Sequence, residues 1–174
     1  MQVRYEPRAD RLLWQVRSAD GALFSVWLTR RLVRALWPPY QALLTQAAIR
    51  QTVPQAGPAS LLPEAQAMLA EQALTRQLPG ARFDQPFLAE AQARPLGAEP
   101  LLPEAIDFGP TAASPPGLRL RVREPDGRSF SLELQADLAA ALARLILQAV
   151  AASDWDLALA TAAPTAAVPP DRLN

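Results

Sequence analysis

The chain has 174 residues, with 17 basic side chains, 17 acidic side chains and a formal net charge of zero. It contains no Cys, no His and no Lys, so every side-chain cation is an Arg. These absences exclude a disulfide framework, thiolate or imidazole metal ligands, a His general base and any Lys-based catalysis, and we expect no cofactor. The sequence therefore favours a non-enzymatic protein.

The sequence predicts neither an export signal at the N-terminus nor a membrane span. The N-terminus has no apolar core of the kind found in signal peptides, and no run approaches the ~20 apolar residues of a membrane span. We therefore expect a cytoplasmic protein with no membrane partner. The abundance of Ala, Pro, Leu and Arg is typical of a GC-rich bacterium.

An internal repeat dominates the sequence. Residues 12–28 match residues 118–134 without a gap, and the match continues as far as Leu36 and Leu142. Each copy alternates apolar and polar residues, turns at Asp-Gly, alternates again and then changes to a helical spacing. The repeat predicts two strand-strand-helix (ββα) units related by a pseudo-twofold axis, forming an α+β domain with one antiparallel sheet packed on two main helices.

The turn sequence predicts the register of each hairpin. Residues 124–128 suit a three-residue loop with Gly127 in the left-handed conformation. This loop places Val122 opposite Phe130, and the same loop in the first copy places Val16 opposite Phe24. A two-residue loop would mix the buried and exposed faces, so we reject it.

We assign residues 1–50 to the first unit, with an extra N-terminal strand around Val3 and Tyr5. Thr29 is the expected N-cap of its helix, which continues to about Arg50. Pro38 and Pro39 predict that this helix is either kinked or broken. Its apolar stripe comprises Leu32, Val33, Leu36, Leu43, Leu44 and Ala47.

The remaining ranges follow from composition and spacing. Residues 51–117 form a Pro/Ala-rich inter-repeat segment with one amphipathic helix over about 61–77, carrying Ala65, Met68, Leu69 and Leu74. Residues 118–159 form the second unit, and 160–174 are expected to be a disordered tail. The second helix, from Ala136 to about Ser153, has an apolar stripe of Leu138, Leu142, Leu145, Ile146, Ala149 and Val150.

The outer faces of the two hairpins differ, and this difference predicts the functional surface. We hypothesise a partner-binding surface for another protein or for a second copy of the chain, because an exposed apolar patch with Trp is typical of an interface. The alternative is that part of 51–117 covers this apolar face. The predicted partner-binding residues are Leu13, Leu23, Trp27, Arg30, Arg31, Arg34 and Trp37.

The second hairpin instead presents an arginine row, Arg119, Arg121 and Arg123. This row predicts an alternative function, the binding of single-stranded nucleic acid. The absence of stacking aromatics on the same face and the zero net charge argue against it. A carboxylate pair among the turn aspartates stays open as a catalytic alternative, but no catalytic motif is present.

Residues 5–37 include Trp27-Leu28-Thr29-Arg30-Arg31 and Leu36-Trp37, and this stretch resembles the N-terminal part of an uncharacterised family of bacterial proteins. The resemblance implies a bacterial origin and no particular activity. The duplicated strand-strand-helix pattern is also similar to the single-stranded nucleic-acid binders of the PUR and Whirly type. Those proteins have longer sheets with basic, aromatic faces, which this chain lacks.

Overall fold

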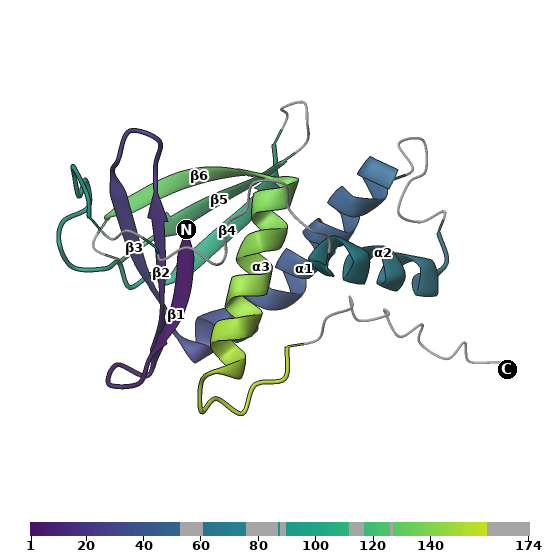
Figure 1. Ribbon diagram of the computed structural model, residues 1–174, viewed down its shortest axis with the longest axis horizontal. Coiled ribbons are helices and arrows are strands. Elements are labelled where there is room, and N and C mark those ends of the chain that lie inside the picture. The colour runs from purple at the N-terminus through teal and green to yellow at the C-terminus, as the bar shows by residue number, and fades with distance from the viewer. Residues whose placement is uncertain (53–60, 76–86, 88–89, 112–116, 126, 160–174) are drawn as a thin grey trace, which may run out of the picture.

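The computed structural model has a mixed α+β fold in which two antiparallel three-stranded sheets pack with three helices (Figure 1). It describes residues 1–52, 61–75, 87, 90–111, 117–125 and 127–159, and these counts refer to that part of the chain. The expected disordered tail lies outside it. In chain order the elements are β1 (Gln2–Glu6), β2 (Arg11–Arg17), β3 (Leu23–Leu28), α1 (Arg30–Thr52), α2 (Pro63–Thr75), β4 (Ala105–Pro110), β5 (Gly117–Arg123), β6 (Ser129–Gln135) and α3 (Ala136–Ala151).

Both hairpins have the predicted register. Val16 lies opposite Phe24 in the β2–β3 pair, and Val122 lies opposite Phe130 in the β5–β6 pair. The register follows from the alternation of apolar residues, since a shift by one residue would turn every buried side chain outward.

The two hairpin loops also have the predicted conformation. Gly21 and Gly127 have φ values of 83° and 89°, in the left-handed region that favours glycine. In the second loop the amide of Glu124 donates to the carbonyl of Arg128 at 3.0 Å, and an equivalent bond closes the first loop. The loop conformation therefore explains the glycine at each turn.

The prediction of one sheet is wrong, because the strands form two separate sheets. Each half supplies a third strand of its own, β1 or β4, although the sequence around Ala105 is irregular. The edge of β3 that does not pair with β2 is also occupied, because parallel bridges to Ala93 and Leu101 form there. With this edge filled, β3 cannot pair with a strand of the second sheet.

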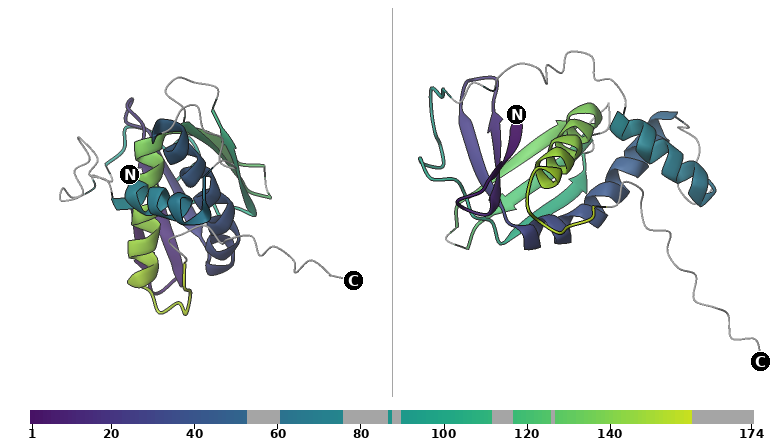
Figure 2. Two further views of the ribbon diagram at one scale, coloured as in Figure 1. Left: turned by 90° about the vertical axis from the view of Figure 1, so that its right-hand side faces the viewer. Right: turned by 60° about the horizontal axis from the view of Figure 1, so that its bottom comes forward.

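The helices connect the two sheets. α3 packs along β1 of the first sheet, and α1 packs on β4 of the second (Figure 2). Tyr40 of α1 illustrates this crossing: its hydroxyl donates to the carbonyl of Ala139 in α3 at 2.8 Å, and its ring centroid lies 5.3 Å from that of Phe108 in β4. Burial raises the pKa of the Tyr40 phenol. Each main helix therefore contributes to a core shared by both halves.

Phe24 and Phe130, which occupy matching positions in the two hairpins, stack on each other. Their ring centroids are 5.0 Å apart with an interplanar angle of 28°, and Trp14 lies 6.4 Å from Phe130. Both phenylalanines are half-buried and not fully enclosed. The duplication and the pseudo-twofold axis stay predictions.

The proline pair does not break α1, which runs as one helix from Arg30 to Thr52. Pro38 and Pro39 are exposed, as are Arg34 and Ala35, whose carbonyls would otherwise accept the missing amide bonds. Water can therefore satisfy these carbonyls, which lowers the cost of the prolines. Thr29 caps the helix as predicted, because its Oγ1 accepts a bond from the Leu32 amide at 3.2 Å.

Each of two predicted apolar stripes contains a residue that is exposed. On α3, Leu142, Ile146, Ala149 and Val150 are buried as predicted, together with several further alanines, whereas Leu138 is exposed. The small alanines allow close packing beside Tyr40. On α2, which begins at Pro63, the predicted packing residue Met68 is 73% exposed.

We predict that Gln41→Met raises the free energy of unfolding by about 1 to 3 kcal/mol, because Gln41 is buried and neither its Oε1 nor its Nε2 has a hydrogen-bond partner in the described part of the chain. Gln15→Met is the matched control. The buried amide of Gln15 accepts from Gln2 at 2.6 Å and donates to Ser25 at 3.0 Å, so this replacement should lower stability. Urea midpoints measure both effects, and a loss of stability in Gln41→Met would contradict the prediction.

Candidate functional site

The predicted apolar face of the first hairpin is covered. Leu13 and Leu23 are only 6% and 3% exposed, and the five central residues of β2 are buried, so both faces of this strand are enclosed. Trp27, which lies opposite Leu13, is half-buried. Leu13 and Leu23 are therefore not part of an exposed contact surface.

Part of the inter-repeat segment lies along the β3 edge of this sheet, and the alternative that this segment covers the apolar face stays a prediction. We call residues 92–101 the edge segment. The Leu23 amide donates to the carbonyl of Ala93 at 3.0 Å, and the Trp27 amide donates to that of Leu101 at 2.7 Å. These main-chain bonds attach the edge segment to β3 at two points.

The second hairpin fastens the same region. Arg128 Nη1 donates to the carbonyls of Leu96 at 3.0 Å and Glu99 at 3.3 Å, and its remaining nitrogens bind the carboxylate of Glu124. Glu124 in turn accepts the amide of Leu102 at 2.9 Å. The Arg128 bond and the Leu102 amide together hold the pKa of Glu124 below its usual range. This pair joins the edge segment to the second sheet.

The cluster at the start of α1 divides into buried and exposed members. Trp37 is buried in the core, whereas Arg30, Arg31 and Arg34 are exposed. Arg30 Nη2 donates to the carbonyl of Asp156 at 2.8 Å, so it binds the segment that follows α3. Trp37 therefore drops out of the predicted surface, and partner binding by Arg31 and Arg34 stays a prediction.

Asp10 organises a contact that the sequence did not reveal. Its Oδ1 accepts the indole N–H of Trp155 at 2.6 Å and the hydroxyl of Tyr5 at 2.9 Å. Asp10 adopts φ 48°, an uncommon conformation for a residue other than glycine, which these bonds help to hold. The Trp155 and Tyr5 bonds, with the charge of Arg30, lower the pKa of Asp10. The chain positions of Asp10 and Trp155 give no local signal of this pairing.

We predict that acid weakens the fold through Asp10 and Glu124. Both have lower pKa values in the folded state, so their stabilisation is complete above the unfolded pKa of about 4 and is lost as pH falls through the folded values. Chemical denaturation at a series of pH values measures this loss. Asp10→Asn should flatten part of the acid limb, and Glu90→Gln, at an exposed carboxylate, should not; equal effects would contradict the assignment.

The arginine row lies on the exposed face of the second sheet, but it is partly neutralised. Arg119 pairs with Glu133 at 2.6 Å, and Arg123 pairs with Asp107 at 3.0 Å. The inward alternation of Ile106, Phe108 and Phe130 leaves no aromatic side chain on the described part of this face. An open hollow at its hairpin end is lined by Arg121, Arg123, Glu104, Glu124 and Ser129, among others.

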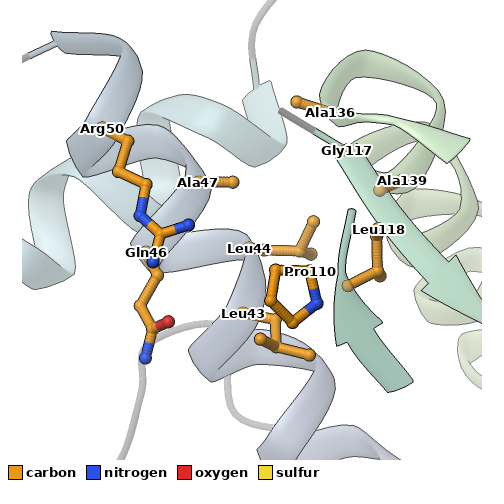
Figure 3. Close-up of a pocket in the computed structure, with 10 residues that line it drawn as sticks. All are labelled: Leu43, Leu44, Gln46, Ala47, Arg50, Pro110, Gly117, Leu118, Ala136 and Ala139. Carbon is orange, nitrogen blue, oxygen red and sulfur yellow. The ribbon is translucent and has the colours of Figure 1, made fainter. Parts of the chain in front are cut away.

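An apolar groove lies where the distal half of α1 leaves the body of the molecule (Figure 3). Its apolar wall comes from α1, the end of β4, the start of β5 and the first turn of α3, and Gln46 and Arg50 stand at the rim. The groove is shallow and open to solvent, with an interior space of about 20 Å³. Its lining residues are Leu43, Leu44, Gln46, Ala47, Arg50, Pro110, Gly117, Leu118, Ala136 and Ala139.

The sequence assigned the groove residues of α1 to the buried stripe. Leu44 is indeed buried, but Leu43 and Ala47 are half-buried because they face the groove. One signal could have identified them: α1 has 23 residues and α3 has 16, so the last turns of α1 have no counterpart in the other half. These turns extend beyond the shared core and pack with α2 (Figure 1).

Comparison with protein-family models, curated proteins and solved structures finds no match. The resemblance of residues 5–37 to a bacterial family therefore stays a prediction. Among the described residues, no three acidic side chains lie close enough together to hold a metal ion. None of the helices in the described ranges is long and apolar enough to cross a membrane.

Proposed function

We propose that the protein is a non-enzymatic protein-binding module, and that the contact surface consists of the apolar groove and the neighbouring helix α2. The observation that supports this proposal is the exposure of Leu62 and Met68, at 74% and 73%, at the start of α2 and within it. Each side chain of α2 that the structure describes is at least partly exposed. Large apolar side chains exposed beside an apolar groove are typical of contact sites.

The proposed contact surface lies in a different part of the fold from the one predicted from the sequence. The sequence directed attention to Leu13 and Leu23, which the fold buries. The α1–α2 hairpin instead projects from the two sheets (Figures 1 and 2). A projecting pair of helices can reach a partner without any change in the core.

Site-specific photo-crosslinking tests this function. In cells of the source organism, a crosslinking amino acid replaces Met68. As a control, it replaces Arg121, an exposed residue of the arginine row. We expect a protein adduct at position 68 that is absent at position 121. The identified protein, which can be another copy of the chain, must then bind the purified wild type and bind Met68→Glu at least about tenfold more weakly. No specific adduct, or unchanged binding, would overturn the proposal.

Nucleic-acid binding is the second candidate, and the exposed arginine row favours it. The ion pairs of Arg119 and Arg123 should make any such binding weak. Retardation of single-stranded DNA at low salt tests it, with Arg119, Arg121 and Arg123 replaced together by Ser. Binding that falls steeply with salt, and is lost in the triple variant, would support this candidate. The absence of retardation by the wild type would reject it.

A further inference from the structure

Helix α2 presents a defined face around Met68. Glu64 precedes Met68 by four residues and Glu71 follows it by three, so both carboxylates share the Met68 face of the helix. Leu69, the next residue, is more buried than Met68, and α2 packs with both α1 and α3. Met68 therefore stands on a face directed away from its own chain, with acidic residues one turn to either side.

The apolar groove has the opposite character. Its wall is formed by aliphatic side chains, and among the described residues that line it Arg50 is the one with a charge. Over Pro38–Thr52, α1 contains one Arg and no carboxylate, whereas α2 contains two Glu and no cation. A flexible methionine suits an irregular apolar groove of this kind. The chain thus carries both an acidic helix face with an exposed methionine and an apolar groove with a cation at its rim.

One chain cannot join these two surfaces by itself. α2 packs against α1 of its own chain, yet Met68 is 73% exposed. A second copy can supply the missing contact. In a twofold dimer, the contact between the Met68 face of one copy and the apolar groove of the other is made twice. Each copy therefore provides both a helix face and a groove.

We propose that two copies of the chain form a twofold dimer in which α2 of each copy places Met68 in the apolar groove of the other. Glu64 of one copy then lies near Arg50 of its partner. The 13 residues of α2 span about 20 Å, and the reciprocal contact doubles the surface that is covered. This inference rests on the proposed protein-binding function and names its partner as a second copy.

Sedimentation of the full chain tests the dimer. At about 100 μM, a complex with a Kd near 10 μM is largely formed. We expect a dimer for the wild type, and a Kd raised about 10- to 100-fold for both Met68→Glu and Ala47→Glu. Leu102→Glu is the matched control, because Leu102 is another exposed large apolar residue but lies outside both surfaces. It should dimerise as the wild type does. Unchanged circular dichroism spectra and melting temperatures exclude unfolding as the cause.

A charge exchange tests the pairing directly. Arg50→Glu and Glu64→Arg should each weaken the dimer, and the double variant should recover most of the wild-type affinity. A wild type that is monomeric at this concentration would overturn the dimer but not the protein-binding function, which the crosslinking experiment decides separately. A dimer that is insensitive to Met68→Glu and to the charge exchange would overturn the assigned surface.

Discussion

Trp14→Ala is expected to lower the free energy of unfolding by about 3 to 5 kcal/mol. The Trp14 side chain is only 1% exposed and belongs to the core between the two sheets. Removing a large buried aromatic side chain loses its transfer free energy and leaves a cavity. Because a domain of this kind is stable by only about 5 to 15 kcal/mol, the loss should be evident as a much lower urea midpoint.

Two further variants test whether the loss of stability in Trp14→Ala comes from the packing of Trp14 in the core. Trp14→Phe retains an aromatic ring, and the Trp14 indole N–H has no hydrogen-bond partner among the described residues, so this change should cost much less. Trp27→Ala removes a half-buried side chain of the same hairpin and should also cost less than Trp14→Ala. Equal losses for Trp14→Ala and Trp27→Ala would contradict the assignment of Trp14 to the core.

Leu101→Ala is expected to cost about 2 to 5 kcal/mol and to loosen the edge segment from β3. Leu101 is 1% exposed, and its backbone bonds Ser25 and Trp27 on either side. Loss of the side chain should allow this region to open more often. Hydrogen exchange should therefore become faster at the amide of Trp27, which donates to Leu101.

The adjacent residue is a close control for this change. Leu102 is 39% exposed, and only its backbone amide binds Glu124, so Leu102→Ala retains that bond. We expect little change in stability or in exchange at Trp27. If both variants behave alike, the edge segment is not held by the burial of Leu101.

The two halves have different outer faces. On the first sheet, a ladder of polar contacts from Gln2 through Gln15 to Ser25 lies among side chains that are buried. The second sheet instead presents Arg119 and Glu133 to solvent. The face of the second sheet is exposed and carries charges, whereas the enclosed face of the first sheet contains Leu13. This difference is expected because burying a charged side chain costs free energy.

The proposed contact surface arises where the two halves differ in length. The last turns of α1 have no equivalent in α3, and they carry Ala47 and Arg50 away from the shared core. α2 packs on this extension with Met68 directed outward. A surface of this kind adds binding capacity without disturbing the two hairpins.

Local chemistry alone determined the hairpins and the helix starts. The alternation around Val122 and Phe130, the left-handed Gly127 and the cap at Thr29 act over a few residues, so they can be predicted from neighbours in the sequence. The same information predicted the α+β class. It could not predict that Asp10 would bind Trp155, because that contact joins residues distant in the chain.

Tertiary structure decided which apolar faces are covered. Leu13 and Met68 are both apolar residues in regular elements, yet Leu13 is buried and Met68 is exposed. Their sequence patterns cannot distinguish these outcomes, because burial depends on which distant segment packs over a face. The separation into two sheets has the same origin, since Ala93 and Leu101 fill the edge of β3.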